Sequence, residues 1–348
     1  MDKHQNLQPA EWDFHRAVWM AWPSHSNLWE ENLEPAQIEF TELCRAIAST
    51  DSHSKEVKAE MLEILVPSEA QMKLASSKLD GLPLRFHLIP FGDVWLRDTA
   101  PIFVKNNLGQ VLPASFKFNG WGEKYLLPFD DKVAANISTA SGKQGVNFDF
   151  VLEGGSVDVD GLGTGLTTEQ CLLNKNRNPH LNKKQIESLL AESLGLKKII
   201  WLNEGLINDH TDGHIDTIAR FIAPGKVVCM QSHDLDDPNH EILEKIANDL
   251  KGQTDAQGRL LEVIRIPSPG IIRDEEGELM PASYVNFYIG NASVIVPTYG
   301  SPNDAAAVAA ISELFPNRKT IGCSAIAILS GGGAFHCITQ QEPLQEKL

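Results

Sequence analysis

Two segments far apart in the sequence carry the residue types that nucleophilic catalysis needs. Cys337 follows three consecutive glycines, Gly331 to Gly333. Such glycines lose much backbone entropy on folding, but they permit a close approach of the backbone to other groups. A cysteine directly after this loop is a candidate nucleophile. His214, within the segment from His210 to Asp216, is the best candidate for its acid/base partner.

The segment around His214 is open to three interpretations. His210, Asp212, His214 and Asp216 alternate, so an extended backbone would place all four side chains on one face. They could then bind Zn²⁺ or Mn²⁺, or His214 could act as a general acid/base flanked by carboxylates. The third interpretation is a polar turn, because Thr-Asp-Gly is common in turns.

The remaining cysteines and His336 are weaker candidates. Alternate residues of an extended strand point to opposite faces, so His336 is predicted to face away from Cys337. The other cysteines lie in apolar or helical contexts and are predicted to be core residues: Cys44, Cys171, Cys229 and Cys323. Five widely spaced cysteines without a CxxC pair indicate neither a disulfide framework nor a zinc knuckle.

Three acidic residues narrow the chemistry. Asp98 follows Trp95-Leu96-Arg97, Asp216 follows His214 by two residues, and Glu153 precedes a Gly-Gly turn. Anions raise the pKa of a nearby thiol and disfavour the thiolate. A planar guanidinium would resolve this conflict, because two carboxylates can bind it and its charge can stabilise an adjacent thiolate. Glu153 would then be free to orient His214.

The composition limits the partners. The formal net charge of −16 disfavours nucleic acid and anionic membranes, and it suits a small cationic substrate. The N-terminal residues show no apolar signal segment, and no apolar run approaches the ~18 residues of a membrane span. We therefore expect a cytoplasmic protein. The sequence does not determine the oligomeric state, and a homo-oligomer is one of the possible states.

Helical and strand patterns alternate along the chain. Helical periodicity covers residues 33–49, 182–194, 239–250 and 304–315. Apolar runs predict strands at residues 84–89, 102–104, 198–202, 217–222, 260–267, 294–297 and 319–323. The alternation indicates an α/β protein. Motifs containing Asp98, Glu153, His214, Asn286 and Cys337 lie 51 to 72 residues apart, which hints at a repeated unit that sends one loop to a shared centre.

The motifs taken together resemble those of the agmatine deiminase family, within the guanidine-modifying (pentein) superfamily. The matching segments span almost the whole chain. They are Trp22-Pro23 with Trp29, residues 93–101, Asn119-Gly120-Trp121-Gly122, Glu153-Gly154-Gly155, residues 160–164, residues 171–179, residues 211–216, residues 284–287, residues 297–300 and residues 331–339.

This resemblance implies both a fold and a reaction. The fold is a five-bladed α/β propeller of ββαβ-type repeats with pseudo-fivefold symmetry, formed by residues 1–348 as a single catalytic domain. The reaction converts agmatine and water to N-carbamoylputrescine and ammonia through a covalent amidino-cysteine, as a step of putrescine and polyamine biosynthesis. It implies no metal and no cofactor.

The resemblance also implies roles for individual residues. Cys337 matches the nucleophile, His214 the general acid/base and Glu153 the acid that pairs with the histidine. Asp98 and Asp216 match the carboxylates that bind the guanidinium. The other substrate contacts implied are Trp95 and Trp121, which would line a slot for the alkyl chain, with Asp93 and Gly333. His210 differs from the acid expected near this position, which leaves recognition of the distal amine open.

Other functions remain as alternatives. Within the superfamily, the protein could be a peptidylarginine deiminase or an arginine deiminase, although free arginine would need a cation for its α-carboxylate. A metal-dependent amidohydrolase would use the four alternating residues of segment 210–216. A non-enzymatic binding module would keep the scaffold and release no ammonia.

Overall fold

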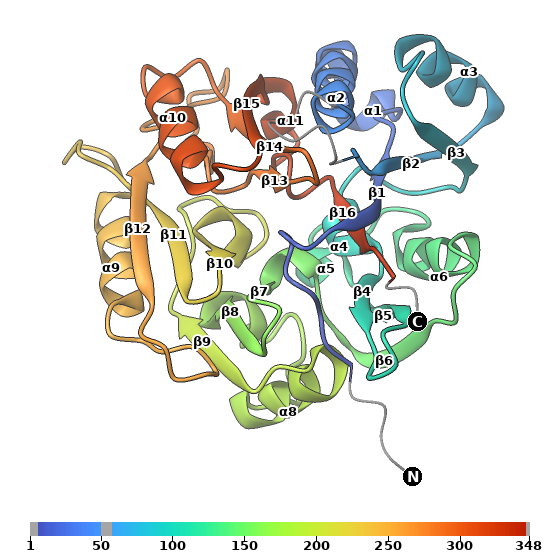
Figure 1. Ribbon diagram of the computed structural model, residues 1–348. Helices are drawn as coiled ribbons and strands as arrows, with labels where there is room; N and C mark the ends of the chain where they lie inside the picture. The colour runs from blue at the N-terminus through green and yellow to red at the C-terminus, as the bar shows by residue number, and fades with distance from the viewer. Residues whose placement is uncertain (1–5, 50–57, 346–348) are drawn as a thin grey trace.

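The strands of this protein form five small sheets arranged in a ring, with most helices on the outer side of the ring (Figure 1). The computed structural model describes residues 6–49 and 58–345. Because strands and helices alternate around one centre, loops from all five sheets can reach the same point. The predicted α/β class with five repeated units is confirmed.

Four of the sheets share one topology. In each, the first two strands are antiparallel and the third strand pairs in parallel with the second. A parallel pair needs a long crossover connection, which here contains a helix. The strands are β4 (Ile102–Lys105), β5 (Val111–Lys117) and β6 (Val146–Val151); β7 (Asp158–Val159), β8 (Thr164–Thr168) and β9 (Lys198–Leu202); β10 (Ala219–Ala223), β11 (Lys226–Gln231) and β12 (Glu262–Pro267); β13 (Tyr288–Ile289), β14 (Ser293–Thr298) and β15 (Lys319–Ser324).

The helices divide into crossover helices and short turns near the centre. The crossovers contain α5 (Gly120–Glu123), α6 (Asp130–Ala140), α7 (Glu169–Leu172), α8 (Lys183–Leu194), α9 (His240–Leu250) and α10 (Asp304–Leu314). Short helical turns precede the first strands: α4 (Leu96–Thr99), η2 (Gly154–Ser156), η3 (Ile215–Thr217) and α11 (Ile326–Ser330). Helix α8 shows why the sequence forms these elements, since Asn182 and Gln185 make a capping box and Gly195 ends the helix with a φ of +74°.

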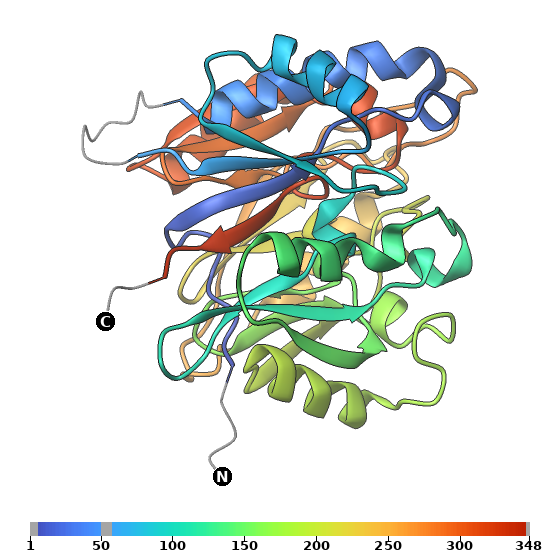
Figure 2. The same ribbon diagram turned by 90° about the vertical axis from the view of Figure 1, so that its right-hand side faces the viewer.

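The fifth sheet joins the two ends of the described chain. Its strand order is β16–β1–β2–β3, and β16 is antiparallel to β1. Figure 2 shows these first and last strands side by side. Its elements are β1 (His15–Ala21), α1 (Ser26–Trp29), η1 (Glu30–Asn32), α2 (Leu33–Ile47), β2 (Met61–Val66), α3 (Glu69–Lys78), β3 (Leu84–Leu88) and β16 (Gln340–Pro343).

The five sequence motifs occupy equivalent places in the five sheets. Each marker residue lies within five residues before a strand at one edge of a sheet: Asp98 before β4, Glu153 before β7, His214 before β10, Asn286 before β13 and Cys337 before β16. The repeated spacing in the sequence therefore reflects one loop per blade. The predicted helices and strands agree with the observed ones to within two residues at each end.

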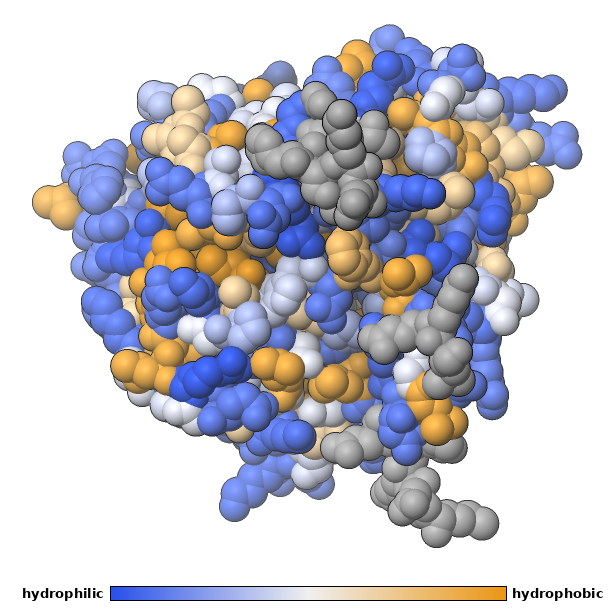
Figure 3. Space-filling view, viewed as in Figure 1, coloured by the Kyte–Doolittle hydropathy of each residue, from blue (hydrophilic) through white to orange (hydrophobic). Residues whose placement is uncertain are grey.

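The surface is largely hydrophilic on the face seen from the side of Figure 1. The face shown in Figure 3 is hydrophilic over most of its area, with separate hydrophobic groups between. Within residues 6–49 and 58–345, no helix combines the length and the apolar character that a membrane crossing requires.

Candidate active site

The three glycines before Cys337 allow the loop to pack against an aromatic ring. A Cβ atom on Gly333 would lie 2.7 Å from the Trp95 ring and 3.1 Å from the Cys337 sulfur. A Cβ atom on Gly331 would lie 2.8 Å from the same ring, and Gly332 has a φ of +106°, which side chains disfavour. Larger residues would therefore fill the space beside the sulfur or push the loop away from Trp95.

The segment that contains Cys337 is a turn rather than an extended strand. The amide of Thr339 donates a hydrogen bond to the carbonyl of His336, at 3.1 Å. The prediction that His336 and Cys337 alternate along an extended strand is therefore wrong. The glycine-rich approach and the tight turn before β16 prevent the backbone from extending here.

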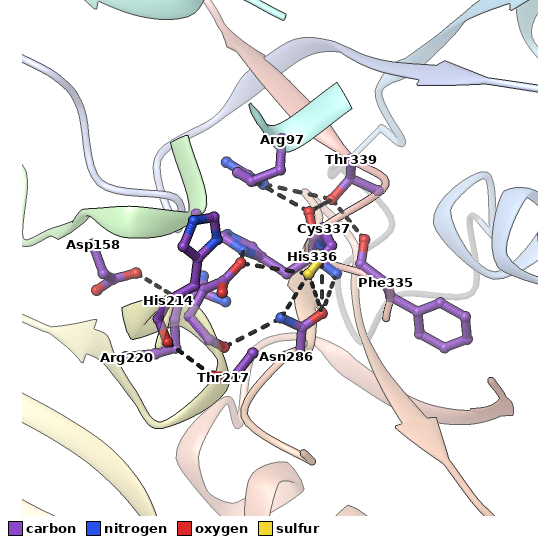
Figure 4. Close-up of polar contacts among 12 residues, drawn as sticks. Arg97, Asp158, His214, Thr217, Arg220, Asn286, Phe335, His336, Cys337 and Thr339 are labelled. Carbon is purple, nitrogen blue, oxygen red and sulfur yellow. Dashed lines mark hydrogen bonds and ion pairs between the residues drawn. The ribbon is translucent and has the colours of Figure 1, made fainter. Parts of the chain in front are cut away.

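Asn286 and Asp216 surround the Cys337 sulfur, as Figure 4 shows for Asn286. The amide nitrogen of Asn286 lies 3.2 Å from the sulfur, and its oxygen accepts a hydrogen bond from the amide of His336 at 3.1 Å. Oδ2 of Asp216 lies 3.8 Å from the sulfur. Burial and the charges of Asp216 and Asp98 raise the pKa of Cys337 well above its usual range. A thiol in these surroundings is protonated at neutral pH.

The segment from His210 to Asp216 forms the polar turn that was one of three interpretations. Asp212 and Gly213 have φ values of +65° and +80°, so the backbone reverses and the alternating side chains separate. His210 is exposed, whereas His214 and Asp216 are buried. Among the residues that the structure describes, His210, Asp212, His214 and Asp216 do not together form a group that could hold a metal ion. The metal-binding interpretation of this segment is wrong.

His214 lies among three groups that favour its charged form. Its Nδ1 is 3.8 Å from Oδ2 of Asp98, and one ring nitrogen lies within 4.8 Å of both a Glu153 oxygen and the Cys171 sulfur. Burial opposes protonation, but Asp98, Cys171 and Glu153 outweigh it and hold the pKa of His214 well above its usual value. Neither ring nitrogen has a hydrogen-bond partner within the described residues. The imidazolium is therefore free to give a proton to a bound molecule.

Glu153 approaches His214 while Arg177 holds it in place. Oε1 of Glu153 accepts a hydrogen bond from Nε of Arg177 at 2.7 Å, and both side chains are fully buried. Arg177 also binds Asp212 at 2.6 Å and the carbonyl of Thr211 at 2.8 Å. The other Glu153 oxygen, Oε2, has no partner in the described part of the chain. Arg177 thus ties Glu153 to the turn that carries His214.

Asp98 and Asp216 are buried beside this turn. Asp98 accepts hydrogen bonds from the amide of Gly155 at 2.9 Å and from Nε1 of Trp121 at 2.8 Å. Asp216 binds His336 through Oδ2 at 2.6 Å, while its Oδ1 has no partner among the described residues. A Cβ atom on Gly155 would lie 2.6 Å from Nδ1 of His214 and 3.0 Å from an oxygen of each aspartate. The three side chains therefore converge where Gly155 has none.

An aromatic cavity of about 250 Å³ leads to Cys337 and Asp98. The predicted substrate contacts Asp93, Trp95, Trp121 and Gly333 all line it, whereas His214, Glu153 and Asp216 lie outside its lining. Further lining residues include Trp29, Tyr125, His210 and Thr211. Both Trp95 and Trp121 are also more than nine-tenths buried. The same two side chains therefore line the cavity and pack in the core.

Asp93 positions two of these rings. It accepts hydrogen bonds from Nε1 of Trp29 at 2.9 Å and from Nε1 of Trp95 at 2.8 Å, and the two rings stack with centroids 6.1 Å apart. Burial raises the pKa of Asp93. Because both of its oxygens are engaged, Asp93 acts on the cavity wall through the indoles that it holds.

Comparison with known proteins gives the family. The model of the Porphyromonas-type peptidyl-arginine deiminase family matches residues 7–343. The chain belongs to this family. It is 39% identical to an agmatine deiminase of Ectopseudomonas mendocina, over 96% of this chain and 95% of that protein.

Solved structures agree with this assignment. An agmatine deiminase of Enterococcus faecalis superposes with a TM-score of 0.89 at 34% identity, covering 98% of this chain and 97% of that one. A cysteine-to-serine variant of a C. jejuni agmatine deiminase with substrate bound gives 0.88 at 30% identity, covering 100% and 99%. The resemblance inferred from the motifs is confirmed, and so is the pentein fold.

Several residues of this family member surround the site without a predicted role. Asn286 and Arg177 belonged to recognisable motifs but were assigned no function, although both contact site residues directly. Arg220 is a charged residue within the apolar run of β10, which could have indicated a buried ion pair. Glu11 had no distinguishing pattern in the sequence, because its partners come from distant segments.

Proposed function

We propose that this protein is an agmatine deiminase, a hydrolase that acts on a linear amidine and releases ammonia and N-carbamoylputrescine. The observation that carries the proposal is the convergence of Cys337, His214, Asp98 and Asp216 beside an aromatic cavity. The full-length relatives named agmatine deiminase support the same activity. Residues 1–348 would act as one catalytic domain, since strands from both ends share a sheet.

The guanidinium group would bind between Asp98 and Asp216. Both carboxylates are buried, and Oδ1 of Asp216 lacks a partner among the described residues, as does Oε2 of Glu153. Leaving a buried acceptor unpaired costs about 1–3 kcal/mol, so a ligand that supplies N–H donors gains by pairing them. A planar guanidinium supplies several such donors in a fixed arrangement and carries the positive charge that these acids require.

Binding of the cation would also activate Cys337. Its pKa is raised by burial and by Asp216 and Asp98, so neutralising these two carboxylates removes the charges that oppose the thiolate. The guanidinium carbon would then lie beside the thiolate in a fixed orientation, which lowers the entropic part of the barrier. The substrate therefore helps to generate the nucleophile that attacks it.

His214 would transfer protons in both halves of the reaction. When the substrate binds, the Cys337 thiol releases its proton to solvent, and the thiolate adds to the guanidinium carbon. The His214 imidazolium then protonates the departing nitrogen, which leaves as ammonia. An amidino-cysteine remains. Neutral His214 then accepts a proton from water as the water attacks this intermediate, and the sulfur leaves and takes the remaining hydroxyl proton, which restores the thiol and gives the neutral urea group. Glu153, within 4.8 Å of the ring, stabilises the imidazolium form.

The cavity fits an alkylamine chain better than free arginine. No arginine or lysine is among the described residues that line it, so the α-carboxylate of arginine would lack a cation. Lys124, near the mouth, pairs with Asp212 at 2.9 Å. Trp29, Trp95, Trp121 and Tyr125 present rings that can attract the distal ammonium. The hydroxyl of Tyr125 and Nδ1 of His210 lie 3.3 Å apart at the mouth of the cavity. Both side chains would contact that ammonium.

The decisive experiment compares ammonia release from agmatine, arginine and an N-acylated arginine amide at equal concentrations. We expect agmatine to give the highest kcat/KM, by about 100-fold or more, because only it avoids burying an unpaired carboxylate or a peptide group. Faster turnover of either arginine compound would show that the assignment of agmatine as the substrate is wrong. Absence of ammonia from all three would overturn the deiminase function.

A further inference from the structure

His336 is a buried titratable residue that the proposed mechanism does not use. It directly precedes Cys337 and is 2% exposed. Its Nδ1 lies 2.6 Å from Oδ2 of Asp216, and its Nε2 lies 2.8 Å from Oε2 of Glu11. The ring therefore bridges two carboxylates, one of which is a proposed substrate ligand. Figure 4 shows His336 beside Cys337 and Asn286.

Each of the two contacts joins a ring nitrogen to a carboxylate oxygen. An ionised carboxylate only accepts hydrogen bonds, and a neutral imidazole donates from only one nitrogen. A histidine between two ionised carboxylates must therefore carry a proton on each nitrogen. Glu11 is kept ionised by Arg220 at 2.9 Å and by Arg97 at 3.4 Å. Burial raises the pKa of Glu11, but these cations and His336 reverse the effect and hold it well below the usual range.

The pKa of Asp216 is lowered by the same ring. Burial raises its pKa, but the hydrogen bond and charge of His336 reverse this and lower it, with help from His214. The charged groups around His336 come from every neighbouring element: Glu11 before β1, Arg97 in α4, Asp158 in β7, Asp216 in η3 and Arg220 in β10. The network is thus anchored to the N-terminal segment and to three blades.

We infer that His336 is a positioning residue for the proposed deiminase: its ring, held by Glu11 on one side, binds Oδ2 of Asp216 on the other and fixes the orientation of that carboxylate. Oδ1 of Asp216 then remains directed to the guanidinium. Glu11, although it has no substrate contact, fixes the orientation of the His336 ring. The inference rests on the proposed function, because it assigns Asp216 the role of a guanidinium ligand.

The principal test is the pH profile of two variants. In His336→Gln, Asp216 loses its cation and its pKa rises, so it protonates at higher pH. We expect kcat/KM for agmatine to fall about 10- to 100-fold, mostly through KM, and its acidic limb to move to higher pH. Glu11→Gln keeps the shape of the side chain but removes the charge, and it should shift the acidic limb in the same direction by less.

A matched control measures the effect of removing a buried histidine elsewhere. His15 is 3% exposed, and its Nδ1 lies 3.4 Å from Oε1 of Glu60 and 3.0 Å from the hydroxyl of Tyr288. His15→Gln should lower stability without moving the acidic limb. If His336→Gln leaves the limb unchanged while wild-type protein is active, the inference is overturned and the proposed function stands. If wild-type protein releases no ammonia from agmatine, the proposed function fails first.

A second measurement is independent of catalysis. In protein with ¹⁵N-labelled histidine, NMR at pH 7 should show both His336 ring nitrogens protonated, because each faces a carboxylate oxygen, and Glu11→Gln should change the signal of the nitrogen that faces Glu11. The His336 signals are identified by their absence from His336→Gln. A neutral His336 ring in the wild-type protein at pH 7 would overturn the inference.

Discussion

The two aspartates beside Cys337 are held in opposite ways. Asp98 accepts hydrogen bonds from neutral donors, the Gly155 amide and the Trp121 indole, and burial raises its pKa although the His214 ring lies 3.8 Å away. Asp216 is bound by His336, and its pKa is lowered in spite of burial. Neutral donors orient a carboxylate without cancelling its charge, whereas a cation keeps a buried carboxylate ionised. The site needs both kinds of contact, because a cationic substrate requires carboxylates that are ionised and correctly oriented in a buried position.

The same difference between carboxylates bound by neutral donors and carboxylates bound by cations is found on the two sides of the site. On the cavity side, Asp93 is bound by the indoles of Trp29 and Trp95, and its pKa is raised by burial. Behind Cys337, Glu11 is bound by His336, Arg97 and Arg220, and its pKa is lowered. The cavity side is thus built to receive positive charge, and the rear is already neutralised.

The largest expected effect comes from the residue between the two sides. Cys337→Ser should reduce turnover of agmatine by about 10⁴-fold or more, because a hydroxyl is a much weaker nucleophile at neutral pH. Binding should persist, since Asp98 and Asp216 are unchanged, and calorimetry with agmatine would measure it. Full turnover by this variant would exclude Cys337 as the nucleophile.

A smaller effect is expected from narrowing the cavity side alone. Gly333→Ala adds a Cβ atom 2.7 Å from the Trp95 ring and 3.0 Å from Cβ of Cys337. The loop or the ring must move, which should lower kcat/KM by about 10- to 100-fold and stability by about 1–3 kcal/mol. Gly145→Ala is a suitable control, because Gly145, like Gly333, does not have a positive φ and the atom nearest to its added Cβ lies 3.5 Å away, at ordinary contact distance. Equal activity losses in both variants would contradict a specific role of Gly333.

The smallest expected effect is on the free energy of unfolding. Its pH dependence allows the two aspartates to be compared directly. Asp98 has a raised pKa when folded, so its contribution to stability falls as pH rises above about 3.9, the ordinary aspartate value. Asp216 has a lowered pKa, so its contribution is present above about 3.9 and is lost as pH falls further.

Urea unfolding of Asp98→Asn and Asp216→Asn from pH 3 to 8 would measure both contributions. Asp98→Asn should remove a decline in the free energy of unfolding towards high pH, and Asp216→Asn should remove a loss of stability towards low pH. Identical changes of slope in the two variants would mean that the cavity side and the rear do not differ electrostatically.

Much of this architecture could be predicted from the sequence. Periodicity located helices such as α8 and α9 and strands such as β9, because local hydrophobic patterns directly report which face is buried. The spacing of Asp98, Glu153, His214, Asn286 and Cys337 predicted loops that meet at one centre, and the structure brings these loops together. Motif order was sufficient because each blade delivers one loop.

The sequence alone thus determined the fold class, the repeated blades and the candidate pairing of Cys337 with His214, since these depend on local patterns and on residue types. Only the tertiary structure decided which charges neutralise one another. The turn at Asp212 and Gly213 separated residues that alternate in sequence, and the turn before β16 placed His336 between Asp216 and Glu11. Glu11 and His336 are 325 residues apart, and their contact exists only because β1 and β16 close the ring. Ion pairing in a buried centre depends on distances of a few ångströms between distant segments, which no local pattern records.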